Sequence, residues 1–295
     1  MDKRRFLHHL VGTSSLLVLA PGSAFAQVSL SKALTPLRIG LTPVFLEDQT
    51  ALLQATQAYL EYRLGRTIQL VQRSSYGEIL SLLFQNKLDF AWICGYPFVH
   101  WREYMRLLAV PLFHGQPLYQ SYFIVSSENR TTQSLLDLRG KLFAYSDPNS
   151  NSGYLVPQYK LWARQEDPRF FFKKAIFTWA HRAVVEAVAA GLVDGGAVDG
   201  YVYDTLALLN PDLVHRTRVV TKSEKFGFPP IVASTHVNHG DFLSLQNALL
   251  AMHRDPHGIA ILRQFNLDGF IVGSDRLYNS INHMMRFVNS KIHAA

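Results

Sequence analysis

The sequence predicts an α/β fold with two units, each a mostly parallel sheet flanked by helices. Strand-like apolar runs alternate with helical patterns along most of the chain, which is the order expected of parallel strands joined by helices. The 295 residues are 48% hydrophobic and 17% charged, as in ordinary globular proteins. This length is sufficient for two domains, each with its own core.

The first unit is predicted from residue 36. Its strands are expected where short apolar runs end at turn residues, at 37–41, 68–71 and 89–94. Its helices are expected where apolar residues recur at helical spacing, from about residue 48 and over 76–84. Gly65 follows the end of the first helix, and Pro97 stands where a first-turn helical proline belongs.

The second unit is predicted from residue 121. Its strands are expected at 122–125, 140–145, 170–178 and 194–198, with a short helix or turn at 134–138 and a helix at 181–190. A return strand at 229–234 and helices at 242–254 and 275–290 follow. Residues 36–120 and 236–295 would then form one unit and 121–235 the other. Two crossing segments, near 118–126 and 228–236, would join them as a hinge.

The N-terminus has the three parts of an export signal. Lys3, Arg4 and Arg5 form a basic region, residues 10–20 are mostly apolar, and Ala24-Phe25-Ala26 matches an A-x-A cleavage site. We therefore expect residues 1–26 to be removed after Ala26. The basic residues also resemble a loose twin-arginine signal, so both export routes stay open. No later apolar run approaches the roughly 20 residues of a membrane helix.

Net charge and cysteine content restrict the classes of ligand and partner that we expect for the chain. The formal net charge is +7, which favours an acidic ligand or an anionic membrane surface. No basic run is interleaved with aromatic residues, so we expect no nucleic-acid partner. The single cysteine, Cys94, excludes an internal disulfide and leaves a free thiol.

The stretch D-P-N-S-N-S-G-Y at 147–154 is the most informative motif. Small hydroxyl and amide side chains and a glycine precede a helical pattern at 155–162. Such a turn directs backbone N–H groups at one point and suits an anion such as phosphate. Ordinary helix capping by Ser or Asn is the alternative.

The predicted topology brings several loops to one crevice. In open α/β sheets, ligands bind outside the carboxyl ends of the strands. The loops that follow predicted strands, and so would line this crevice between the units, are at 42–43, 94–97, 146–153, 178–181 and 199–201.

Five motifs carry a family resemblance over roughly residues 36–290. They are LRIGLTP, DFAWICGYPFV, SLLDLRGKLFAYSDPNSNSGYLVP, AHRAVVEAVAAGLVDGGAVDGYVYD and FGFPPIVAS. In this order they resemble the periplasmic binding proteins of the phosphonate, phosphite and phosphate type, within the type 2 periplasmic binding fold. The resemblance implies a non-enzymatic, monomeric periplasmic protein without a cofactor. It would capture a small oxyanion by hinge closure and present it to a membrane ABC permease.

The resemblance also implies the site residues. Ser150, Asn151 and Ser152 match the turn that wraps the oxyanion, although the family usually has Thr where Asn151 stands. His181 and Asp199 match the family's histidine and acidic residue. Each of these two could instead be a structural cap.

The opposite wall of the crevice would come from the first unit. Tyr96 matches the family's aromatic wall, although it could equally be hinge packing. Thr42 and Cys94 lie in the neighbouring loops, which we expect the ligand to meet when the hinge closes.

Cys94 leaves two further functions open. A branch of the same family binds arsenite through a cysteine and signals to a membrane sensor histidine kinase, and a thiol in the cleft is compatible with that role. The thiol would be a metalloid ligand in that case only, and no other metal site is expected. A Cys94–His181 nucleophilic pair in an enzyme is the third class, but no nucleophile motif surrounds Cys94.

Overall fold

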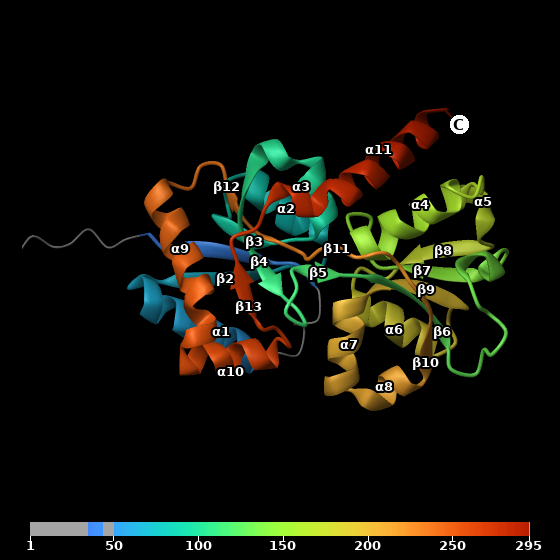
Figure 1. The fold of residues 1–295 in the computed structure, drawn as a ribbon, viewed down its shortest axis with the longest axis horizontal. Helices are drawn as coiled ribbons and strands as arrows, with labels where there is room; N and C mark the ends of the chain where they lie inside the picture. The colour runs from blue at the N-terminus through green and yellow to red at the C-terminus, as the bar shows by residue number, and fades with distance from the viewer. Residues whose placement is uncertain (1–34, 44–49, 295) are drawn as a thin grey trace, which may run out of the picture. The chain divides into compact units, whose positions relative to one another are not determined.

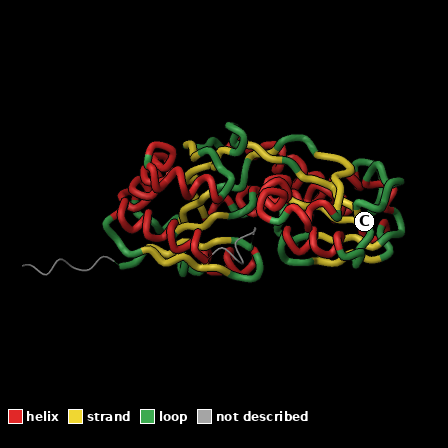
Figure 2. The backbone as a smooth tube through the Cα atoms, turned by 90° about the horizontal axis from the view of Figure 1, so that it is seen from below, coloured by secondary structure: helices red, strands yellow, loops and turns green. Residues whose placement is uncertain are grey.

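The computed structural model describes residues 35–43 and 50–294, which lie in one compact unit of the chain, Leu34–Ala295. The predicted export signal at 1–26 lies outside the described residues. Two large β-sheets organise the unit, with helices around each (Figures 1 and 2). In the described part of the chain, no helix combines the length and the apolar character needed to cross a membrane.

The first sheet has six strands in the order β13-β4-β12-β3-β1-β2. We call the part of the chain built on it lobe 1. Its strands are β1 (Leu37–Leu41), β2 (Ile68–Gln72), β3 (Phe90–Trp92), β4 (Met105–Leu112), β12 (Ile231–Ser234) and β13 (Gly269–Ile271). Its helices are α1 (Thr50–Leu64), α2 (Tyr76–Phe84), α3 (Gly95–His100), α9 (His239–Ala251), α10 (Pro256–Gln264) and α11 (Asn279–Ala294).

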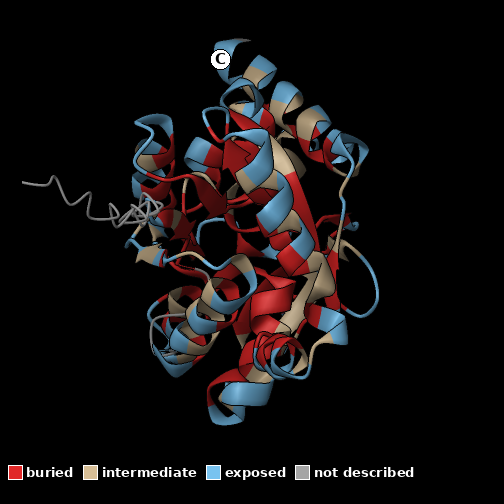
Figure 3. Ribbon diagram, turned by 90° about the vertical axis from the view of Figure 1, so that its left-hand side faces the viewer, coloured by how far each residue is buried: buried red, intermediate tan, exposed pale blue. Residues whose placement is uncertain are grey.

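The central strands of lobe 1, β3 and β12, are fully buried, and β1 is buried at all but one position. Figure 3 shows buried residues gathered inside the molecule and exposed residues on the outer helices. β1 is covered by α2, and an added Cβ at Gly40 would lie 2.5 Å from Leu88 Cδ1, so only glycine allows this close approach. A capping box starts α2, in which the Ser75 side chain and the Glu78 side chain each accept from the other's backbone N–H. This cap fixes the helix start that faces lobe 2.

The second sheet has five strands in the order β10-β6-β9-β7-β8, and we call the part built on it lobe 2. Its strands are β6 (Ser121–Ser126), β7 (Leu142–Tyr145), β8 (Lys174–Phe177), β9 (Gly195–Asp199) and β10 (Thr217–Lys222). Its helices are α4 (Val156–Trp162), α5 (Pro168–Phe171), α6 (His181–Ala189), α7 (Gly200–Leu209) and α8 (Pro211–His215). Val184, Val185 and Val188 of α6 are buried in its core.

Both sheets are mixed, which corrects the prediction of mostly parallel sheets. The strands joined through helices are parallel, namely β1 with β2 and β3, and β7 with β8 and β9. The strands next to the lobe crossings run antiparallel, as β12 does to β3 and β4, and β6 to β9 and β10. A chain that leaves one sheet and later returns to it enters from the opposite direction, which the strand–helix alternation alone does not reveal.

Two short strands lie at the crossings between the lobes, one inside the predicted segment near 118–126 and the other just before the predicted segment near 228–236. A short two-stranded ladder pairs β5 (Leu118–Tyr119) with β11 (Phe226–Gly227). β12 belongs to the lobe 1 sheet, although the second part of this unit is predicted from the sequence to begin only at residue 236. The exact unit boundaries stay predictions. A further connection comes from α11, which contacts α3 of lobe 1 and α4 of lobe 2 (Figure 1).

Most predicted elements are confirmed within a few residues, but the strand at 170–178 is wrong in its first half. The chain forms α5 there before β8 begins, because Pro168 occupies the first turn and the Asp167 side chain caps it by accepting from Arg169 N. The helix expected at 275–290 is a 3₁₀ turn followed by α11. Strands β4, β10 and β13 and helices α7, α8 and α10 were not predicted.

Candidate functional site

The turn after β7 is a π-helical segment, Asn151–Leu155, that continues into α4. Leu155 N donates to Ser150 O at 3.0 Å, and Ser150 Oγ caps the segment by accepting from Gly153 N at 2.9 Å. π-helical turns are rare and often occur at functional sites. Ser150, Asn151 and Ser152 have no exposed surface, so the turn is held inside the protein.

Gly153 is required by the packing of this turn. A Cβ at this position would lie 1.9 Å from Ser146 Oγ and 3.1 Å from His181 Cε1. Both distances are shorter than ordinary van der Waals contact. The absence of a side chain therefore lets the turn approach the end of β7 and the start of α6.

His181, the first residue of α6, is held in one tautomer. Its Nδ1 accepts from the backbone N–H of Asp199 at 3.0 Å, so the ring hydrogen resides on Nε2. Nε2 lies 3.4 Å from Ser150 Oγ and donates to it. Burial lowers the pKa of His181 to about 3, which keeps the ring neutral.

This arrangement determines what the Ser150 hydroxyl can do. Its oxygen already accepts from Gly153 N–H and from His181 Nε2–H. The hydroxyl hydrogen is therefore available to donate to another group.

Asp199 ends β9 and caps α7. Its Oδ1 accepts from the backbone N–H groups of Tyr201 and Val202. Burial raises the pKa of Asp199 to about 8, although these two hydrogen bonds act in the opposite direction. Asp199 is thus a helix cap, which was one of the two roles considered for it from the sequence.

Cys94 and Tyr76 of lobe 1, and Tyr119 of the crossing strand β5, contact the turn. The Asn151 backbone N–H donates to Cys94 Sγ at 3.2 Å, and Asn151 Nδ2 donates to the Tyr119 hydroxyl at 3.0 Å. The Tyr76 backbone N–H donates to Asp147 Oδ2 at 3.0 Å, which places a lobe 2 carboxylate at the start of α2. These contacts describe a closed arrangement of the two lobes.

The Cys94 thiol is buried, and burial raises its pKa to about 11. Hydrogen bonds from Asn151 N, Tyr96 N and the Tyr119 hydroxyl act against this shift. The thiol is therefore protonated at neutral pH, unlike a reactive or metal-binding thiolate.

Several buried polar atoms of the turn have no hydrogen-bond partner. In the described part of the chain these include Ser146 Oγ, Asn151 Oδ1 and Ser152 Oγ. Buried polar groups are almost always paired, and each exception calls for an explanation. Their grouping within one turn indicates a place where a polar ligand would complete the hydrogen bonding.

Two predicted site residues lie at the edge of this cluster. Thr42 is buried, but its Oγ1 donates to Trp92 O at 3.2 Å and so joins β1 to β3. Tyr96 is half-buried and packs edge-on against His100, and burial, with a smaller effect of the neighbouring Tyr154, raises the pKa of Tyr96. The structure thus gathers Ser150, Asn151, Ser152, His181, Asp199 and Cys94, with Tyr96 next to Cys94. Thr42 is hydrogen-bonded to the strand that leads to Cys94 and to none of the other predicted site residues.

Four residues that contribute to the geometry of the site were not identified from the sequence, namely Tyr119, Asp147, Ser146 and Gly153. Asp147 and Gly153 lie inside the motif that was singled out, and Tyr119 lies in a predicted crossing segment. Tyr76, from the sequence a weaker candidate than Tyr96 for the aromatic wall, stands edge-on to the His181 ring, with 6.5 Å between centroids.

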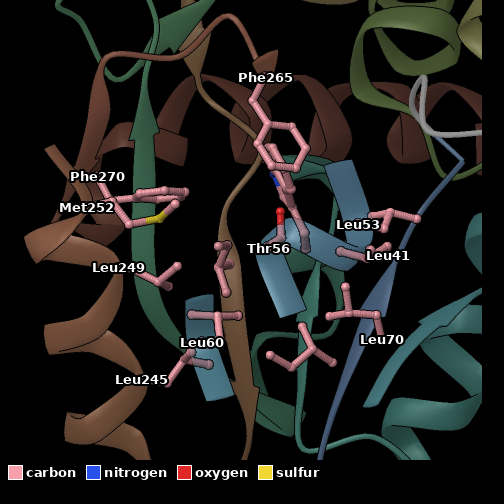
Figure 4. Close-up of a pocket in the computed structure, with 13 residues that line it drawn as sticks. Leu41, Leu53, Thr56, Leu60, Leu70, Leu245, Leu249, Met252, Phe265 and Phe270 are labelled. Carbon is pink, nitrogen blue, oxygen red and sulfur yellow. The ribbon is translucent and has the colours of Figure 1, made fainter. Parts of the chain in front are cut away.

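An apolar cavity of about 50 Å³ lies elsewhere in lobe 1. Figure 4 shows it between α1, α9 and the sheet, surrounded by side chains such as Leu41, Leu60 and Leu249. The Thr56 hydroxyl in its lining donates to Leu52 O. This apolar lining offers an anion no suitable partner.

Residues 39–278 match the family described as ABC transporter, phosphonate, periplasmic substrate-binding protein. The chain belongs to this family. It is 24% identical over 222 residues to the phosphonates-binding periplasmic protein of Escherichia coli, covering 73% of this chain and 65% of that protein. It is 28% identical over 189 residues to a probable ABC transporter phosphite binding protein of Prochlorococcus marinus, covering 58% and 61%. The chain thus spans less than two thirds of the length of these curated relatives.

Solved structures show the same type 2 periplasmic binding fold. A binding protein component of an ABC phosphonate transporter from Pseudomonas aeruginosa has a TM-score of 0.79 at 21% identity, covering 86% of this chain and 87% of that one. PhnD1 from Prochlorococcus marinus, in complex with methylphosphonate, has a TM-score of 0.76 at 21% identity, with coverages of 86% and 98%. At this identity the likeness concerns the fold.

Proposed function

We propose that this chain is a periplasmic solute-binding protein that captures a small phosphorus oxyanion and presents it to an ABC permease. The observation that carries the proposal is the Ser150–Ser152 turn. Its hydroxyls are buried, and the Ser150 hydroxyl hydrogen is free to donate. Family membership and the methylphosphonate in a relative of the same fold support the ligand class.

The ligand contacts follow from the hydrogen bonds already made. The Ser150 and Ser152 hydroxyls would donate to ligand oxygens at the start of the π-helical segment. His181 would hold Ser150 in place through Nε2–H. Asp199, whose pKa of about 8 keeps the carboxyl protonated at neutral pH, would donate to a ligand oxygen. Cys94, Tyr96 and Thr42 would form the wall on lobe 1.

Hinge closure is the proposed binding mechanism. The ligand would bind the turn in an open form and favour the closed form through contacts that only closure makes. The bonds from Asn151 N to Cys94 and from Tyr76 N to Asp147 are contacts of this kind. The ABC permease would recognise the closed arrangement.

The site does not support a nucleophilic enzyme. A Cys94–His181 pair needs a base with a free lone pair near the thiol. His181 Nδ1 is occupied by Asp199 N–H, Nε2 carries the hydrogen, and the Cys94 thiol has a raised pKa. We therefore assign binding and no turnover.

The arsenite-sensor alternative receives no support from the comparisons. The relatives reported above are named for phosphonate and phosphite. The buried, protonated thiol is also a poor starting point for a metalloid bond. Export with cleavage after Ala26, and action as a monomer, complete the proposal.

A thermal-shift screen of residues 27–295 tests the ligand class. Phosphate, phosphite, methylphosphonate, arsenate and arsenite would each be added to the wild type and to Cys94→Ser. A ligand that binds the native state raises Tm by mass action. We expect a phosphorus oxyanion to raise Tm in both proteins. A shift with arsenite alone that is lost in Cys94→Ser would contradict the proposal.

A further inference from the structure

Asn151 carries an acceptor that no other described residue uses. The residue is fully buried, its backbone N–H donates to Cys94 Sγ and its Nδ2 donates to the Tyr119 hydroxyl. Its Oδ1 is buried and has no partner within residues 35–43 and 50–294. Leaving a buried carbonyl oxygen unpaired costs about 1–3 kcal/mol, so this position is suited to a donor.

A neighbouring hydrogen bond shows which end of the amide is unpaired. Asn151 Nδ2 donates to the Tyr119 hydroxyl oxygen at 3.0 Å, so this end of the amide is already paired. Oδ1 is the end that stays without a partner.

The turn thus offers two kinds of contact. The Ser150 and Ser152 hydroxyls can donate to deprotonated oxygens of an anion. Asn151 Oδ1 has only lone pairs to offer and repels a deprotonated oxygen. An anion that satisfies all three residues has bare oxygens and one hydroxyl.

We propose that Asn151 Oδ1 accepts the hydrogen bond of a P–OH group and so makes the site selective for singly protonated phosphorus oxyanions. This inference rests on the proposed function and refines its ligand class. The monoanions of phosphonates and phosphite, and the hydrogen phosphate dianion, each carry one such hydroxyl. Sulfonates of the same shape and charge lack the hydrogen and are rejected.

Methylphosphonate and methanesulfonate form the matched pair of probes. At a pH where methylphosphonate is a monoanion, the two ligands have the same charge and nearly the same shape, and differ in one hydrogen. A site built to pair a ligand hydroxyl strongly rejects the analogue without it. Calorimetry on the wild type is expected to give a preference for methylphosphonate of about 100-fold or more.

The Asn151 variants assign this preference to the amide. Asn151→Leu removes the acceptor, so the ratio of the two affinities falls at least about tenfold. Asn151→Asp keeps an acceptor and retains the preference, even if both affinities decrease. Asn247→Leu, the same exchange at an exposed position of α9, leaves the ratio unchanged.

If Asn151→Leu does not fold, Tyr119→Phe is the second variant that tests the role of the amide. It removes the partner of Nδ2, frees the amide to rotate and lowers the ratio. Equal binding of the two ligands by the wild type would overturn the inference, since Nδ2 would then face the ligand. An unchanged ratio in folded Asn151→Leu or Tyr119→Phe would overturn it too. Failure of every phosphorus oxyanion to bind would instead contradict the proposed function.

Discussion

The backbone N–H of Asp199 donates to His181 Nδ1 at 3.0 Å, and this bond connects the end of β9 to the start of α6. It orients Nε2–H toward Ser150 Oγ. One backbone group on a strand therefore sets the hydrogen-bonding state of a serine in the turn on the other side of the ring. The donor character of the turn is consequently a property of the lobe 2 sheet as well as of the Ser/Asn motif.

Asp199→Asn tests the burial of this carboxyl. The pKa of Asp199 is about 8 in the folded protein, compared with about 3.9 in an unfolded chain. The folded state therefore holds the proton more tightly, and wild-type stability gains as pH falls from about 8 toward 4. The variant keeps the N-cap but has no titrating group.

The measurement is the difference in unfolding free energy between wild type and Asp199→Asn across this range. The unfolding free energy of the wild type, relative to that of Asp199→Asn, should increase by about 1 kcal/mol for each pH unit by which the pH falls. The comparison cancels the opposite contribution of His181, which both proteins retain. A difference that stays constant from pH 8 to pH 5 would show that Asp199 is charged in the folded state.

Gly153→Ala tests the packing of the turn. The added Cβ would collide with Ser146 Oγ at 1.9 Å, and overpacking of this kind costs about 1–3 kcal/mol. We expect methylphosphonate affinity to fall at least about tenfold. The double variant Ser146→Gly, Gly153→Ala should recover part of it.

Gly77→Ala is the matched control for this experiment, because its added Cβ would meet only Asn149 Nδ2 at 3.8 Å. Its affinity should remain close to that of the wild type. If Gly153→Ala binds as tightly as Gly77→Ala, the close approach of the turn to Ser146 is not needed for binding.

The alkylation rate of Cys94 tests the closed arrangement. The thiol is 4% exposed and its pKa is about 11, so about one thiol in a thousand is ionised at pH 8. Iodoacetamide should react far more slowly with native than with denatured protein, and more slowly still with ligand. Cys94 is the sole cysteine of the chain, so mass spectrometry reads it directly. Equal native and denatured rates would refute the burial.

The sequence was informative wherever a local pattern carried the structure. The capping residues and apolar spacing predicted helices such as α2 and α6, and the Ser/Asn motif predicted the turn. The fold class followed from the alternation of strands and helices. The family resemblance named His181 and Asp199, which the structure brings within hydrogen-bond distance of each other.

The features of the fold and of the site that the sequence did not predict depend on contacts between segments far apart in the chain. The antiparallel direction of β12 depends on how the chain returns to lobe 1. Asp147 and Tyr76 meet only when the lobes are together. The tautomer of His181 depends on a backbone group of β9. None of these relationships can be predicted from the spacing of residues in the sequence.

The central claim is that the Ser150–Ser152 turn binds the oxyanion, and isothermal titration of Ser150→Ala, Ser152→Ala with methylphosphonate tests it most directly. Both substitutions remove hydroxyls and leave the backbone in place, so the thermal unfolding transition should persist. The account predicts that the wild type binds and that the folded double variant shows no measurable heat of binding. Affinity equal to that of the wild type in the folded double variant would contradict the assignment of this site.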